Sequence, residues 1–169
     1  MSMVDIGSTG SPASSNAMLE QKLRAEHLVK NAAGWFLAIA GLSVLNSVLT
    51  LSGAGFHFIF GLGITEIVDE VGKQTGATGS TLGLVVNLFI AGVFVLFWKF
   101  ARTGAKWAFL VGMALYAIDG LILIPFKDFL GVAFHAYALF RIYQGLQGIP
   151  VLENLRRMAA PVPAPIEPS

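Results

Sequence analysis

The chain has 169 residues, of which 55% are hydrophobic and only 12% are charged. Soluble domains are usually about 45–50% apolar and about 25% charged, so this composition favours a membrane protein. The net charge of +1 offers no electrostatic basis for nucleic-acid binding, and the absence of cysteine excludes disulfides, thiolate metal sites and thiol catalysis.

The N-terminal region divides into a tail and a short amphipathic helix. Residues 1–17 are rich in Ser, Gly and Ala and have no apolar period, which predicts a disordered tail. Over residues 18–31, Leu19, Leu23 and Leu28 line one side of a helix and charged residues occupy the rest. This pattern predicts an amphipathic helix at the cytoplasmic surface of a membrane, leading directly into the first span.

The first span is predicted over residues 32–51, because its apolar run is too long for the core of a signal peptide. Ser43, Asn46 and Thr50 share one face, which indicates a side turned toward protein. The next stretch, residues 53–79, is glycine-rich and then amphipathic with a helical period. It is predicted to lie on the extracytoplasmic side, either in the interface or as a re-entrant segment.

Three further spans are predicted over residues 81–98, 105–125 and 129–149, and a Pro-rich cytoplasmic tail over residues 150–169. In the second span, Gly83, Asn87 and Ala91 form a stripe that suits close helix contact, either within the chain or with another copy. Spans three and four form a hairpin with its turn at residues 125–128. The predicted fold class is therefore an all-α polytopic membrane protein with four transmembrane helices.

Basic residues determine the predicted orientation. Nine of the eleven Lys and Arg residues fall on one side of a four-span arrangement, which the positive-inside rule makes cytoplasmic. Both termini are then cytoplasmic, and the location is a cell inner (plasma) membrane. The nine residues are Lys22, Arg24, Lys30, Lys99, Arg102, Lys106, Arg141, Arg156 and Arg157.

Each span contributes a polar residue at a similar depth. With a rise of about 1.5 Å per residue, Asp119 and His135 lie about 9–10 Å from the turn that joins their helices. Asn46 and Asn87 lie at a matching level on the first two spans, and Tyr116 shares a face with Asp119. The spacing predicts a polar cluster in the outer half of the bundle. Two interpretations remain open, a set of packing hydrogen bonds or a site for a proton, a cation or a small polar ligand.

The extracytoplasmic segment carries a possible acidic face formed by Glu66, Asp69 and Glu70, with His57 on the same side. A solvated surface is the simpler interpretation, and a ligand site is the alternative. A metal held by Asp119 and His135 together with Glu66 or Asp69 is a weaker hypothesis, because no paired-His or HExxH spacing occurs. We expect no metal, no cofactor and no catalytic residue, since the GxSxG and SxxK motifs are also absent.

Three stretches of sequence carry a resemblance. GMALYAIDGLILI followed by DFLGVAFHAYAL, with the earlier GLGITEIVDEV, resembles a set of small four-helix bacterial inner-membrane proteins that have no established activity. The likeness covers roughly residues 34–148. It implies four spans and a bacterial inner membrane, and it assigns no functional residue.

Three functions follow as hypotheses. The first is a structural or accessory membrane protein, or a subunit of a larger complex, whose polar residues serve packing. The second is a small transporter or a proton- or cation-binding protein that uses Asp119 and His135. The third is an intramembrane enzyme at the outer face. The expected partners are the lipid bilayer and, for the first two hypotheses, a second copy or a larger membrane complex, with no nucleic acid.

Overall fold

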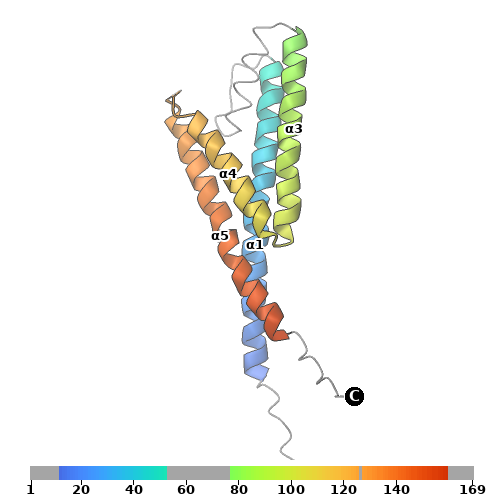
Figure 1. The fold of residues 1–169 in the computed structure, drawn as a ribbon, viewed down its shortest axis with the longest axis vertical. Helices are drawn as coiled ribbons and strands as arrows, with labels where there is room; N and C mark the ends of the chain where they lie inside the picture. The colour runs from blue at the N-terminus through green and yellow to red at the C-terminus, as the bar shows by residue number, and fades with distance from the viewer. Residues whose placement is uncertain (1–11, 53–76, 126, 160–169) are drawn as a thin grey trace, which may run out of the picture.

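The computed structural model describes residues 12–52, 77–125 and 127–159. Within these ranges the chain is all-helical with no strand, as the sequence predicts. The helices are α1 (Pro12–Leu51), α3 (Ala77–Arg102), α4 (Lys106–Ile122) and α5 (Phe129–Ala159), shown in Figure 1. His57, Glu66, Asp69 and Glu70 lie outside the described residues, as do the rest of the predicted amphipathic segment up to residue 76 and the outer parts of both tails.

Helix α1 begins earlier than predicted. It runs without a break for 40 residues, so the six residues from Pro12 to Ala17, assigned to a disordered tail, are helical. The amphipathic segment and the first span are one helix. Two i, i+4 ion pairs, Arg24 with Glu20 and Lys30 with Glu26, brace its exposed first half.

Helix α5 ends later than predicted. The predicted Pro-rich tail begins at residue 150, yet the helix continues through Pro150 to Ala159. Packing explains the difference, because Leu152 and Leu155 are buried. Lys106 also donates a hydrogen bond to Glu153 at 2.8 Å, which ties this last part of α5 to the start of α4. These contacts offset the hydrogen bond that the proline removes.

The helices pack as two antiparallel pairs that share a core. Helix α1 lies against α3 and α5, and α4 lies against α5 and α3. Phe36 of α1 occupies the centre, with ring centroids 5.9–6.3 Å from those of Phe94, Phe97 and Phe109. Figure 1 shows the upper ends of α4 and α5 leaning away from those of α1 and α3.

Two glycines allow the closest helix approaches near this core. A Cβ on Gly112 of α4 would lie 2.6 Å from the Phe36 ring. A Cβ on Gly145 of α5 would collide with the Ala32 side chain of α1. Only a residue without a side chain fits at these contacts, so the glycines fix how tightly α4 and α5 lie on α1.

Apolar length differs among the helices. By length and composition, α1 over Ala13–Leu49 and α3 over Gly83–Ala101 are sufficient to cross a membrane. Helix α4 has 17 residues, and His135, Arg141 and Gln144 interrupt the apolar run of α5. The structure therefore gives two candidate spans in the described residues, and the other two remain predictions.

Candidate functional site

The hairpin of α4 and α5 positions the central pair of polar residues. Helix α4 ends at Ile122, three residues before the predicted end of the third span, and α5 begins at Phe129, as predicted. Lys127 takes a positive φ of 57° in the turn, and the Asp128 carboxylate accepts a hydrogen bond from the Gly131 N–H at 3.0 Å. This N-terminal cap starts α5 in a register that places His135 opposite Asp119.

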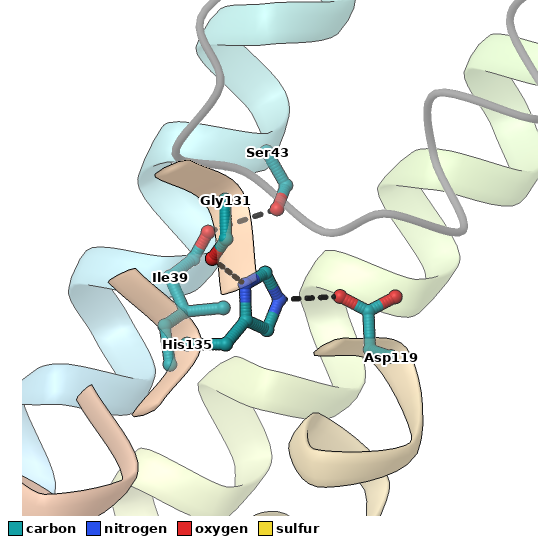
Figure 2. Close-up of polar contacts among 5 residues, drawn as sticks. All are labelled: Ile39, Ser43, Asp119, Gly131 and His135. Carbon is teal, nitrogen blue, oxygen red and sulfur yellow. Dashed lines mark hydrogen bonds and ion pairs between the residues drawn. The ribbon is translucent and has the colours of Figure 1, made fainter. Parts of the chain in front are cut away.

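Asp119 and His135 form a direct, buried hydrogen bond between the two helices. Asp119 Oδ2 and His135 Nε2 lie 2.9 Å apart, and the residues are only 5% and 2% exposed (Figure 2). The second ring nitrogen, Nδ1, lies 2.8 Å from the Gly131 carbonyl oxygen. That oxygen can only accept, so Nδ1 carries a proton and donates it.

This geometry determines the net charge of the pair. One more proton must lie between Oδ2 and Nε2, because two lone pairs at 2.9 Å would repel. If His135 holds that proton the pair is an ion pair, and if Asp119 holds it both groups are neutral. The net charge is zero in both cases. A pair of this kind can be buried without an unbalanced charge, and it holds one proton that can move between its members.

Tyr116 lies one turn before Asp119 and covers the imidazole. Its ring stacks on the His135 ring with centroids 4.2 Å apart and an interplanar angle of 18°. The residue is fully buried, yet its hydroxyl has no hydrogen-bond partner. Buried hydroxyls usually have such a partner, so this one can still receive or donate a bond.

Gly120 makes the contact of α4 with α5 possible at this level. A Cβ at Gly120 would lie 2.9 Å from the Cβ of His135, which is closer than two side chains tolerate. The absence of a side chain next to Asp119 therefore allows the imidazole to reach the carboxylate. Sequence reasoning missed this glycine, although its position directly after a buried aspartate was a usable signal.

The predicted cluster contains two interhelical hydrogen-bonded pairs, Asp119 with His135 and Asn87 with Ser47. Asn87 of α3 donates a hydrogen bond to the Ser47 hydroxyl of α1 at 2.9 Å, and both residues are buried. Asn46 is also buried, and the Ser43 hydroxyl donates to the Ile39 carbonyl within α1 (Figure 2). The Phe94 ring of α3 packs edge-on against the Tyr116 ring, with ring centroids 6.1 Å apart. We refer to Asp119–His135 and Asn87–Ser47 as the polar pairs.

Sequence reasoning selected Asp119, His135, Tyr116, Asn46 and Asn87, and the structure buries all of them. It missed Ser47 as the partner of Asn87. The available signal was the spacing from Ser43 to Ser47, which places both hydroxyls on one face of α1. The stripe of Gly83, Asn87 and Ala91 is buried inside this chain, so its contact is internal.

The described residues contain no group of three or more His, Asp or Glu side chains arranged to hold a metal ion. The site can form hydrogen bonds, and the pair of Asp119 and His135 can hold a proton. Comparison of the chain with models of protein families, with curated proteins and with solved structures finds no match. The class that the fold and the site define is a helical protein with two helices able to cross a membrane and buried interhelical polar pairs.

Proposed function

We propose that this chain is a four-span integral membrane protein that serves as a structural or accessory subunit, and that the polar pairs hold its helices together. One observation carries the proposal: the buried bond between Asp119 and His135 joins α4 to α5 and satisfies both imidazole nitrogens. The bond between Asn87 and Ser47 likewise joins α3 to α1. Hydrogen bonds of this type hold helices together where lipid removes the hydrophobic drive for association.

The distribution of side chains supports a lipid environment for all four helices. Large apolar residues point outward on every helix, and Phe89 and Phe129 are 74% and 76% exposed. The buried polar side chains point inward. A soluble protein rarely exposes such a continuous apolar surface, whereas a bilayer favours it. The outward apolar residues include Leu37, Leu45, Val48, Val85, Leu88, Leu96, Leu110, Ile118, Leu121 and Phe140.

The arrangement of basic residues supports cytoplasmic termini. Lys106 contacts Glu153, and Gly148 packs against Val29, so the start of α4, the last part of α5 and the first part of α1 lie at one end. Arg102 also lies there, 5.0 Å from the centroid of the Trp98 ring. A gathering of basic groups and tryptophan at one end is typical of a cytoplasmic interface. From the resemblance to small bacterial inner-membrane proteins, we also propose that this membrane is a bacterial inner membrane.

Cysteine labelling tests the topology, because the natural chain has no cysteine. Thr103→Cys lies between α3 and α4, Lys127→Cys lies between α4 and α5, and both positions are exposed. In intact spheroplasts, a membrane-impermeant maleimide should label Lys127→Cys, and it should label Thr103→Cys only after permeabilisation. Labelling of both positions from the same side would contradict the proposed spans α4 and α5.

Two replacements of Asp119 test the packing role. Asp119→Asn keeps a donor for His135 Nε2, so it should lower stability little. Asp119→Leu leaves the buried Nε2 without a partner and should cost about 1–2 kcal/mol. Thermal unfolding in detergent measures both, and cellular abundance should fall in the same order. Equal stability of the Leu variant and the natural chain would refute the packing role.

A second function, proton transport, is favoured by the Tyr116 hydroxyl, which lies buried without a partner beside a pair that holds one mobile proton. Dye-loaded vesicles under a potassium diffusion potential test it. Proton flux should then be lost in Asp119→Asn, although this variant stays folded. Asp128→Asn, which changes a carboxylate in the turn, is the matched control. Flux equal to that of empty vesicles would rule this function out.

A further inference from the structure

Arg141 lies near the middle of α5, and its side chain is partly buried. Gly145, one turn further along α5, packs against Ala32 and the Phe109 ring. Gly145 is therefore level with Phe109, which lies three residues after Lys106 in α4. Arg141 lies four residues further in the same direction along the antiparallel α5. At about 1.5 Å per residue, Arg141 is about 10 Å beyond the level of Lys106. Its distance from Phe129, at the outer end of α5, is about 18 Å along the helix. If the proposed spans hold, the backbone of Arg141 lies within the hydrocarbon layer of the membrane.

No acidic group in the described residues balances this charge. Every carboxylate there already has another partner, and Arg141 Nε is buried without a hydrogen-bond partner. The pairs are Glu20 with Arg24, Glu26 with Lys30, Glu153 with Lys106, Asp119 with His135, and Asp128 with the Gly131 N–H. An arginine at this depth is costly unless a carboxylate or a similar acceptor meets it, and such residues usually serve a function.

The neighbours of Arg141 indicate what kind of acceptor fits. Tyr137 and Gln144 lie at i−4 and i+3, so they share its face of α5. Tyr137 is 52% exposed, and its ring packs edge-on against Trp35 with ring centroids 5.4 Å apart. Gln144 is half-buried. Hydrogen-bonding side chains therefore occur at successive turns over about 10 Å of helix. Lipid acyl chains have no hydrogen-bonding groups to offer these side chains, whereas the side chains of a second helix can provide them.

We propose that the face of α5 formed by Tyr137, Arg141 and Gln144 docks a transmembrane helix of another protein that carries an Asp or Glu at the depth of Arg141. The planar guanidinium suits a carboxylate, with which it forms two parallel bonds. A second copy of this chain docked symmetrically through the same face would bring arginine against arginine. The proposal rests on the membrane-spanning role proposed above and names the partner class of that accessory subunit.

The test uses the full chain in neutral phosphatidylcholine vesicles and a leucine-rich transmembrane peptide with one Glu about 10 Å from its end. Energy transfer between labelled peptide and labelled protein measures association. The Glu peptide should bind about tenfold more tightly than the same peptide with Gln or Leu at that position. This comparison needs no protein variant, so it holds even if a change at Arg141 impairs folding.

Variants then locate the contact. Arg141→Gln should abolish the preference for the Glu peptide, and Arg141→Lys should weaken it by losing the second parallel bond. Arg102→Gln is the matched control, because Arg102 is an exposed arginine at the helix end, against Trp98. The preference should survive in that control. Arg141→Glu should reverse the choice and favour a peptide with Lys.

Two results would overturn the proposal. One is equal binding of the Glu, Gln and Leu peptides. The other is retention of anionic phosphatidylglycerol that depends on Arg141, with no preference for the Glu peptide, because the acceptor is then a lipid phosphate. The cysteine-labelling and Asp119 experiments test the topology and the packing role independently of these two results. Failure of the docking proposal is therefore distinguishable from failure of the proposed membrane topology.

Discussion

Gly120→Ala is the most direct perturbation of the contact between α4 and α5. The added Cβ would lie 2.9 Å from His135 Cβ, whereas carbon atoms prefer about 3.5–4.0 Å. Helix α4 must therefore move away by about 0.6 Å or more. The same movement would stretch the bond from Asp119 to His135 from 2.9 Å to about 3.5 Å, at the limit of a hydrogen bond.

The magnitude follows from opposing effects. Replacing a helical glycine with alanine gains about 1 kcal/mol. Overpacking costs about 1–3 kcal/mol, and the weakened interhelical bond adds about 0.6–1.7 kcal/mol. We expect a net loss of about 0.6–3.7 kcal/mol. Gly92→Ala is the control, because a Cβ there meets nothing within 4 Å, and it should be neutral or slightly stabilising.

Thermal unfolding of the purified protein in detergent gives the stability difference, and nitrogen NMR of labelled histidine reports on His135 Nε2. The expected result is lower stability together with a shifted Nε2 signal in Gly120→Ala only. Gly120→Ala and Gly92→Ala with equal stability and an unchanged His135 signal would refute the description of this contact.

Three further predictions concern other parts of the chain. Gly145→Ala should destabilise by about 1–3 kcal/mol because its Cβ collides with Ala32, whereas Gly34→Ala, with open space around it, should not, and unfolding in detergent measures both. Tyr116→Phe should be neutral or stabilising by up to about 1 kcal/mol, because it removes a buried hydroxyl that bonds nothing; a clear loss of stability would contradict that environment. The Lys106 hydrogen bond lowers the pKa of Glu153 below its ordinary 4.5, so the pair should stabilise above that pH and lose its effect as the pH falls through the lowered pKa. The apparent Tm of Lys106→Gln should therefore fall less than that of the natural chain between pH about 6 and about 3, and identical falls would contradict the pairing.

Periodicity was sufficient to predict the helices, because apolar residues dominate the runs that form α3, α4 and the first part of α5. The face of α4 that holds Ala108, Gly112, Tyr116 and Asp119 is buried as its spacing predicts. Depth counting from a shared turn also placed Asp119 level with His135. Two helices joined by a short turn have their residues at matched heights, so this estimate needs no knowledge of packing.

Helix ends and partners were not predictable in the same way. Pro150 and the Ser-rich start of α1 are local signals for non-helical chain, yet both lie within helices. At Pro150 the packing of Leu152 and Leu155 overrides the local signal. Asn87 donates a hydrogen bond to Ser47 because α3 lies against α1. Which helix faces which depends on close approaches at glycines, and a single sequence does not show which glycines are used.

The unbroken length of α1 has a mechanical consequence. Its 40 residues span about 60 Å, roughly twice the thickness of a bilayer core. Eleven residues separate Phe36, at the centre of the bundle, from Ser47, which is about 16 Å along the axis. A tilt of about 5° around Phe36 would move Ser47 by about 1.4 Å, enough to break its 2.9 Å bond with Asn87. A tilt imposed on the exposed first turns of α1 would therefore displace Ser47 in the interior of the bundle.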